Sequence, residues 1–284
     1  MSLGGPDLLP REGDILGPYR LRGLLGEGAI GRVFLAERTD DGSLLALKVL
    51  KAALSADQTY VRRFVREARV AAEVKSGHLV GIVDLGEADG VHYLAVEYVR
   101  GGTLEERLQA TGPLAVAECV RLTAEIGRGL DTLHGAGVIH RDVKPSNVMI
   151  DLSGTAALTD FGLAKGRAYT ALTRPGQVMG TLDYLAPELI KGDTATPASD
   201  IYSLGCLVYE CLTGEPPFAK RGIFGVAVAH LDHQPDDPAA AREDVPSELG
   251  WVVLQALAKD PARRPSTAAA FSHMLGAAHG SHTR

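Results

Sequence analysis

Apolar and polar residues alternate in short runs over the first hundred residues, a pattern typical of β-strands with one buried face. Residues 32–37 and 44–49 flank a Thr-Asp-Asp-Gly turn signal and therefore predict a β-hairpin. Residues 79–86 and 91–98 predict two further strands, which an Asp-Gly turn separates. One helix interrupts the strands, because apolar residues recur at helical spacing over residues 61–72.

The pattern becomes helical after Gly101-Gly102, which marks a predicted boundary between two regions. Apolar residues at helical spacing then predict long helices over residues 115–134, 199–213 and 249–258. The sequence therefore predicts an α+β protein in which a small β-rich region precedes a larger, mainly helical one.

The 284 residues are enough for about two folding units. We predict a β-rich domain over residues 19–99 and a helical domain over residues 100–275. Residues 1–18 are rich in glycine, proline and charge, so we expect a flexible lead-in there. Residues 276–284 are expected to form a flexible tail.

Composition narrows the classes of function. The net charge of −6 shows no basic excess of the kind that general nucleic-acid binding requires, so we expect no nucleic-acid partner. The three cysteines cannot all pair, and none lies in a C-x-x-C spacing, which fits a reducing cytosol. No stretch reaches the roughly 18 to 20 apolar residues of a membrane span. We therefore expect a cytoplasmic protein.

A glycine-rich turn at Gly26, Gly28 and Gly31 is the first candidate for chemistry. A dinucleotide-binding fold would place a helix directly after the glycines and an acidic residue about 20 positions on. Here the residues that follow are strand-like, and Lys48 stands 22 positions after Gly26. Glycines between two strands let backbone N–H groups approach phosphate oxygens, so nucleotide binding and an ordinary turn both remain open.

Lys48 lies among apolar residues of a predicted strand, where lysine is rare without a partner. Its ammonium group either extends from a half-exposed strand to solvent or contacts phosphates with the help of a carboxylate. Glu67 is the candidate carboxylate, since it lies at the border of the apolar face of the predicted helix. An ordinary surface helix would also contain such a glutamate.

The decisive stretch combines His140, Asp142, Lys144 and Asn147 with an Asp-Phe-Gly triplet that begins at Asp160. Together with the glycine turn, Lys48, Glu67 and the triplet Ala-Pro-Glu at 186–188, it resembles the eukaryotic-type protein kinases. The resemblance covers residues 19–275, and the composition is most similar to the bacterial Hanks-type serine/threonine kinases. It implies a bilobal kinase fold with a β-rich N-lobe and a helical C-lobe.

The resemblance implies ATP as the nucleotide, with Mg²⁺ or alternatively Mn²⁺ as the metal. Asp160 and Asn147 are the implied metal ligands, and hard cations favour such oxygen donors. His140 and Phe161 are expected to act as packing support rather than as reacting groups.

Catalytic roles follow from the same resemblance. Asp142 is expected to orient the acceptor hydroxyl and take its proton. Lys144 is expected to neutralise charge on the moving phosphoryl group. Lys48, paired with Glu67, is expected to hold the α- and β-phosphates.

The adenine site is implied by register with these motifs. The apolar residues that would enclose the purine are Val33, Ala46 and Met149. The backbone of Glu97 and Val99 would hydrogen-bond its edge, and Val96 would control access to a deeper pocket.

Protein hydroxyls of serine and threonine are the expected acceptors, because Asp-Val-Lys-Pro-Ser-Asn at 142–147 resembles serine/threonine kinases. A kinase-like small-molecule phosphotransferase is the first alternative, but such enzymes usually lack the segment that ends in Ala-Pro-Glu. Here that segment is present, as are Asp200, Gly205 and Arg264, the expected partner of Glu188. A pseudokinase is the second alternative, but its usual substitutions are absent from the lysine and aspartate positions.

Regulation is expected to involve activation-loop phosphorylation at Thr173 or Thr170, through autophosphorylation in a transient homodimer. Arg141 and Lys165 would contact the phosphate, and Arg63 faces the same space one helical turn before Glu67. Alternatively these cations are solvated or pair with acidic neighbours. Many relatives in this family carry a membrane span after the kinase domain, so the chain is either a cytoplasmic protein or the cytosolic part of a membrane-anchored one.

Overall fold

A computed structural model describes residues 10–28, 30–161 and 182–282. Contacts divide the chain into two compact units. The first comprises residues 1–75 and 80–100, and the second comprises residues 76–79 and 101–284. The division after Arg100 lies one residue from the predicted domain boundary. No helix in the described ranges is long and apolar enough to cross a membrane.

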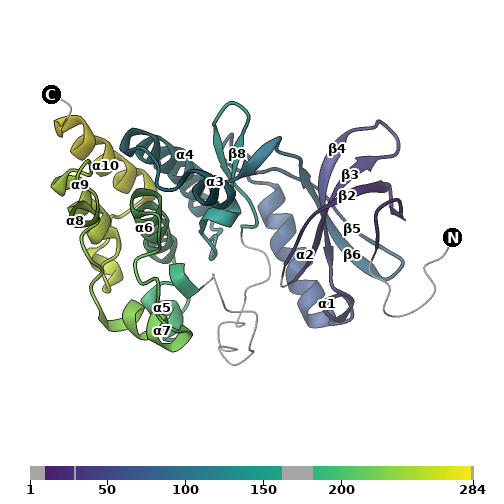
Figure 1. The fold of residues 1–284 in the computed structure, drawn as a ribbon. Coiled ribbons are helices and arrows are strands. Elements are labelled where there is room, and N and C mark those ends of the chain that lie inside the picture. The colour runs from purple at the N-terminus through teal and green to yellow at the C-terminus, as the bar shows by residue number, and fades with distance from the viewer. Residues whose placement is uncertain (1–9, 29, 162–181, 283–284) are drawn as a thin grey trace. The chain divides into compact units, whose positions relative to one another are not determined.

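The first unit is built on a six-stranded antiparallel sheet (Figure 1). Its spatial order is β1-β2-β3-β4-β6-β5. The strands are β1 (Ile15–Leu16), β2 (Tyr19–Glu27), β3 (Gly31–Arg38), β4 (Leu44–Leu50), β5 (Ile82–Ala88) and β6 (Val91–Glu97). The predicted hairpin is β3 and β4. The strand predicted to begin at residue 79 begins at Ile82, because Leu79 belongs to the second unit and forms a bridge with Leu158 of that same unit.

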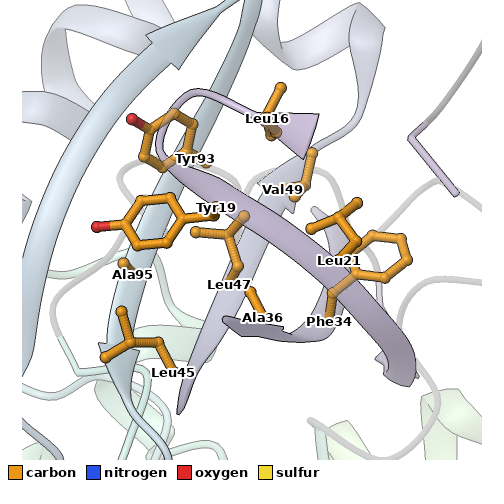
Figure 2. Close-up of a cluster of buried hydrophobic side chains, with 10 residues drawn as sticks. All are labelled: Leu16, Tyr19, Leu21, Phe34, Ala36, Leu45, Leu47, Val49, Tyr93 and Ala95. Atoms are coloured by element: carbon orange, nitrogen blue, oxygen red, sulfur yellow. The ribbon is translucent and has the colours of Figure 1, made fainter. Parts of the chain in front are cut away.

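Alternate residues of these strands meet in one apolar cluster (Figure 2). Leu45, Leu47 and Val49 point to the same side of β4, as the two-residue period of a strand requires. Leu16 belongs to this cluster and is fully buried. Residues 15 and 16, expected in a flexible lead-in, are therefore ordered in β1, because burial of Leu16 offsets the cost of fixing the backbone.

Two helices complete the first unit, α1 (Ala52–Ser55) and α2 (Gln58–Ala72), and α2 packs against β5. Asp57 begins α2 by accepting hydrogen bonds from the backbone N–H groups of Thr59 and Tyr60. The buried side chains of α2 lie on one face, at the spacing that the sequence shows. They are Val61, Phe64, Ala68 and Ala71.

The second unit is mainly helical, with a three-stranded sheet of order β7-β8-β9 (Figure 1). The strands are β7 (Gly101–Thr103), β8 (Val148–Asp151) and β9 (Ala156–Leu158). The α-helices are α3 (Leu104–Thr111), α4 (Val116–Gly135), α5 (Pro187–Ile190), α6 (Pro197–Thr213), α7 (Ile223–Asp232), α8 (Pro238–Ala241), α9 (Ser247–Ala256) and α10 (Ala268–His282). Short 3₁₀ turns are η1 (Pro145–Asn147), η3 (Leu182–Tyr184) and η4 (Pro261–Arg263).

Helix α6 is the centre of the second unit. It is apolar on nearly every side, and residues 199–209 are all buried, as expected for a helix enclosed by others. Helix α10 packs on α4 and α9. Residues 276–282, expected as a flexible tail, are helical because Leu275 and Ala278 are buried in this packing. Asp131 of α4 also accepts from the first two N–H groups of α10, Ala268 and Ala269, at 3.0 and 2.8 Å.

Candidate active site

The glycine turn joins β2 and β3 of the first unit. Gly28 N–H donates to Gly31 O at 2.8 Å, which closes the turn. A Cβ added to Gly31 would lie 2.0 Å from the carbonyl oxygen of Val49, so only glycine allows this close approach of two strands. A Cβ at Gly26 or Gly28 would meet none of the described residues within 4 Å, apart from its neighbours in the chain, so their backbone borders open space in this part of the structure. The turn therefore has the free backbone surface that a phosphate cradle requires.

Lys48 lies on the face of the sheet opposite the apolar cluster. In β4 it alternates with Leu47 and Val49, and it stands directly opposite Val33 of β3. Ala46 is two residues earlier and therefore points to the same side as Lys48. Register thus places the predicted phosphate-binding lysine and two predicted adenine residues on one face. Lys48 is only 9% exposed.

Glu67 lies half-buried on α2, and its carboxylate acts electrostatically on Tyr60 two turns earlier. Burial raises the pKa of Tyr60 to about 12, and the charge on Glu67 adds to this rise. The pairing of Glu67 with Lys48 stays a prediction.

The strand end at Glu97 was predicted to bind the adenine edge. Glu97 N–H donates to Gly81 O at 2.9 Å, and its carboxylate accepts from Gly81 N–H at 3.1 Å. The N–H of Glu97 is therefore already used within the first unit. Val96 stands opposite Ala46 and shares its face, whereas Val99 follows the end of β6 and is half-buried.

The loop of residues 140–147 in the second unit, called the catalytic loop below, is held by a buried carboxylate of α6. Asp200 is 1% exposed and accepts from His140 N–H at 2.9 Å and from Arg141 N–H at 2.8 Å. His134 Nε2 also donates to it, at 2.8 Å. Arg141 adopts a left-handed backbone with φ of +68°, which costs of order 1–3 kcal/mol. The hydrogen bonds to Asp200 hold the loop in this conformation.

Three predicted site residues lie together in this loop. Asn147 Nδ2 donates to the Asp142 carboxylate and to the Asp142 carbonyl, each at 2.8 Å. Lys144 Nζ lies 3.3 Å from Asp142 Oδ2. The side chains of Asp142 and Lys144 are 13% and 19% exposed, so solvent only partly screens the pair. The second unit therefore groups a carboxylate, an ammonium and an amide.

Asp160 stands two residues after the end of β9. Thr159 N–H donates to Asn147 O at 3.0 Å, which fixes the approach of this segment to the catalytic loop. Asp160 has a φ of +60°, a left-handed conformation that aspartate tolerates better than most residues. Met149 of β8, the third predicted adenine residue, is half-buried. Phe161 is buried with its ring 6.3 Å from that of His140, which fits the expected packing role of both.

The donor set of Asn147 and Asp160 fits a hard divalent cation. Because Asn147 Nδ2 donates to Asp142, its amide oxygen is the atom available to a metal. Among the described residues no group of three His, Cys, Asp or Glu side chains could hold a metal ion. Mg²⁺ suits such a sparse set, since it commonly binds through one or two protein ligands, phosphates and water.

The comparisons with known proteins decide the family, since residues 19–275 match the protein kinase domain. The chain belongs to the protein kinase family. The resemblance and the fold class predicted from the sequence are thereby confirmed, because the kinase domain of PknI from Mycobacterium tuberculosis is also similar. That solved structure has a TM-score of 0.78 and 30% identity, and the match covers 96% of this chain and 100% of the other.

Two curated relatives of this kinase domain come from mycobacteria. Serine/threonine-protein kinase PknE of Mycobacterium tuberculosis is 40% identical over 254 residues, which are 89% of this chain and 45% of PknE. Serine/threonine-protein kinase PknH of Mycobacterium bovis is 38% identical over 258 residues, 91% of this chain and 43% of PknH. The chain thus spans less than half the length of these relatives. Family members generally use ATP with a divalent metal.

The Ala-Pro-Glu triplet at residues 186–188 is bound to the helical core of the second unit. Arg264 has a fully buried side chain and donates to both oxygens of Glu188, at 2.7 and 2.8 Å. Burial alone would raise the pKa of Glu188, but the hydrogen bonds and charge of Arg264 outweigh it and lower the pKa. Ser199 of α6 donates to the same carboxylate at 2.8 Å. The Ala-Pro-Glu triplet is therefore fixed from α6 and from the turn at η4.

Sequence reasoning missed a second contact to this segment. Tyr184 donates its hydroxyl hydrogen to Glu210, and Ser203 Oγ donates to Tyr184 O at 2.7 Å. Burial raises the pKa of Glu210 to about 7, an effect that the Tyr184 hydrogen bond partly offsets. A signal exists in the sequence, because Asp200, Ser203 and Glu210 are polar residues at helical spacing on an otherwise apolar helix.

Most of the residues predicted to take part in regulation are not among those that the structure describes. Thr170, Thr173 and Lys165 fall outside the described residues. Arg141 is described, half-buried, with its backbone held by Asp200.

Proposed function

We propose that the chain is an ATP-dependent serine/threonine protein kinase that transfers the γ-phosphate of Mg-ATP to protein hydroxyls. The observation that carries the proposal is the grouping of Asp142, Lys144 and Asn147 in one hydrogen-bonded loop. Phosphoryl transfer depends on positioning and on stabilisation of charge, and these residues supply a proton acceptor, a cation and a metal ligand. The names of the curated relatives support serine and threonine as acceptors.

In the second unit, Asp142 orients the acceptor hydroxyl and takes its proton as the new O–P bond forms, while the bond from the γ-phosphorus to the bridging oxygen breaks and ADP leaves. Asn147 fixes the Asp142 carboxylate through its Nδ2 hydrogen bond. Lys144 neutralises the negative charge that develops on the phosphoryl oxygens. Asp160 and the amide oxygen of Asn147 hold Mg²⁺, or Mn²⁺ in its place, which shields charge on the phosphates when bound.

In the first unit, Lys48 binds the α- and β-phosphates and Glu67 holds its ammonium group in place. The glycines of the turn, Gly26, Gly28 and Gly31, let the backbone approach the phosphate oxygens, while the Gly28 N–H keeps the turn closed by donating to Gly31 O. Val33 and Ala46, which lie on the same sheet face as Lys48, contact the adenine, and backbone atoms of Glu97 and Val99 bind its edge. Met149 is the adenine residue that belongs to the second unit.

Autophosphorylation of Thr173 or Thr170 in a transient homodimer is part of the proposal. A phosphate there would interact with Arg141 and Lys165, since it adds a charge of about −1.5 to −2. The reaction consumes ATP and acts on proteins, so we place it in the cytoplasm.

The test is transfer of labelled phosphate from ATP with Mg²⁺, followed by mass spectrometry of the modified residues. Asp142→Asn is expected to lower kcat by about 10²- to 10⁴-fold while ATP affinity measured by calorimetry stays unchanged. Asp40→Asn is the matched control, because Asp40 is exposed in the β3–β4 turn. Normal turnover by Asp142→Asn would contradict the assignment. Transfer to choline or an aminoglycoside but to no protein would favour a small-molecule phosphotransferase.

A further inference from the structure

The outer face of α2 carries a row of arginines that the kinase reaction does not use. Arg62, Arg66 and Arg69 are separated by four and three residues, so they share one face of the helix. All three are exposed. Glu67, the carboxylate within the helix, lies on a different face, and Glu73 caps the C-terminal end without an ion pair to the row among the described residues.

Several arginines elsewhere in the chain differ from this row because they pair with carboxylates. Arg22 bonds to Glu37 at 2.6 Å, and Arg107 bonds to Glu118 at 2.7 Å. Across the described ranges, the three arginines of the row have no ion pair and no side-chain hydrogen bond. Their positive charge is therefore directed at solvent.

Valines lie between the arginines of this row. Val61, Val65 and Val70 join them in lining an open surface hollow, and none of the described acidic residues is part of its lining. Val70 is 47% exposed, although it is a large apolar residue. A surface that combines an apolar floor with arginine is typical of protein interfaces, where arginine is enriched and other charged residues are depleted.

We propose that this face of α2 docks an acidic segment of a partner protein. Carboxylates of the segment bind the guanidinium groups of Arg62, Arg66 and Arg69, whose planar forks suit carboxylates. An aliphatic or aromatic side chain of the segment fills the hollow between Val65 and Val70. The row is about 10 Å long at the rise of an α-helix, which matches about three residues of extended peptide.

The charge of the whole chain favours a short peptide over a large polyanion. At −6 the chain as a whole repels a membrane surface or a nucleic acid, whereas screening beyond the Debye length of about 8–10 Å weakens the effect of distant acidic residues on a short segment bound at the row. A short acidic segment contacts the arginine row alone and so receives its attraction without that repulsion. The valines add an apolar contact that phosphate groups would not use.

The test is fluorescence anisotropy of the whole chain with a fluorescein-labelled peptide, Glu-Glu-Leu-Phe-Glu-Asp-Leu. We expect saturable binding that weakens as salt is added, and at least about tenfold weaker binding by the variant R62E/R66E/R69E. The variant R11E/R20E/R263E is the matched control, because it lowers the net charge equally through exposed arginines outside α2. Val70→Asp is expected to weaken binding as well.

The proposal is overturned if the control variant loses as much affinity as the row variant, or if the unaltered chain does not bind the peptide. It is also overturned if vesicles of phosphatidylcholine and phosphatidylserine bind to the row and the peptide does not. Sedimentation that shows a dimer dissociated by the row variant would identify a second copy as the occupant instead. The readout is binding, so the result is independent of phosphoryl transfer.

Discussion

The two compact units hold their reactive side chains in different ways. In the first unit, the strand period and the register of β3 with β4 place Lys48, Val33 and Ala46 on one face. In the second unit, Asp142 lies in a loop, where its neighbours depend on side-chain hydrogen bonds. Asp200 of α6 accepts from the backbone of that loop across 59 and 60 residues of sequence.

This difference between strand register and side-chain hydrogen bonds determines which substitutions each unit tolerates. Backbone hydrogen bonds between the strands decide which residues share a face of the sheet, so a side-chain substitution leaves that arrangement intact as long as these hydrogen bonds remain. A loop conformation held by one buried carboxylate is lost when that carboxylate is lost, because its donors then stay buried without partners. Substitutions at a few side chains of the second unit should therefore have the larger effects.

The largest expected effect concerns Asp160 of the second unit, the proposed metal ligand. Asp160→Asn is expected to reduce phosphoryl transfer at saturating Mg-ATP at least about 10²-fold, because a neutral amide holds the cation poorly. Stability should change little, since asparagine also tolerates the left-handed backbone at this position. Asp89→Asn is the matched control, because Asp89 has a φ of +51° in the turn between β5 and β6. Wild-type transfer by Asp160→Asn would show that the metal is held elsewhere.

Asp200→Ala tests the support of the catalytic loop directly. It removes the acceptor of three hydrogen bonds, so we expect a loss of about 3 kcal/mol or more in the free energy of unfolding, together with loss of transfer. Urea unfolding measures the first quantity and label transfer the second. Asp200→Asn keeps one acceptor oxygen, so its loss of stability and of transfer should be smaller than that of Asp200→Ala. If Asp200→Ala had an unchanged urea midpoint and unchanged phosphoryl transfer, the second unit would not depend on single side chains more than the first unit does.

Gly31→Ala tests whether the site of the first unit depends on the close approach of the β3 and β4 backbones. The added methyl group would meet the Val49 carbonyl oxygen, so we expect a loss of about 1–3 kcal/mol in stability and weaker ATP binding. Gly23→Ala in β2 is the matched control, because its Cβ would meet nothing within 4 Å. Thermal unfolding and calorimetric ATP titration measure both effects. Equal behaviour of the two variants would mean that the strands can separate without cost.

The smallest expected effect is a pH dependence of stability at Glu210. Burial raises the pKa of Glu210 to about 7 from the ordinary 4.5, so the folded state binds a proton that the unfolded state has released. The contribution of Glu210 is present at acidic pH and is lost as pH rises from 4.5 through about 7. Glu210→Gln should therefore flatten the unfolding free energy between pH 5 and pH 8. An unaltered pH profile would show that Glu210 ionises normally.

Local patterns predicted much of the first unit. The hairpin expected over residues 32–37 and 44–49 is β3 and β4, and the helix expected over residues 61–72 is most of α2. The missed β1 has two residues, too few to show a period. The missed end of α10 is rich in alanine and glycine, so it lacks the apolar stripe by which helices are found.

Contacts between distant residues were much less accessible. Motif spacing indicated Asp142 and Asn147, but it contained nothing about the hydrogen bond that joins them. Asp200 was recognised as a feature of the family's substrate platform, whereas its structural role is to hold the catalytic loop. Such a role depends on how α6 packs, and packing is not encoded in any local period.

The sequence distance to Asp200 has a consequence for the order of folding. The β3–β4 hairpin closes over neighbouring residues, whereas the catalytic loop needs α6 from 59 to 60 residues further along the chain. Contacts between distant residues form late, because closing a long loop costs entropy before any contact is gained. A newly synthesised chain thus acquires its β3–β4 hairpin early and the conformation of the loop that carries Asp142 only after α6 has packed. Kinase activity would then appear only when folding of the second unit is complete.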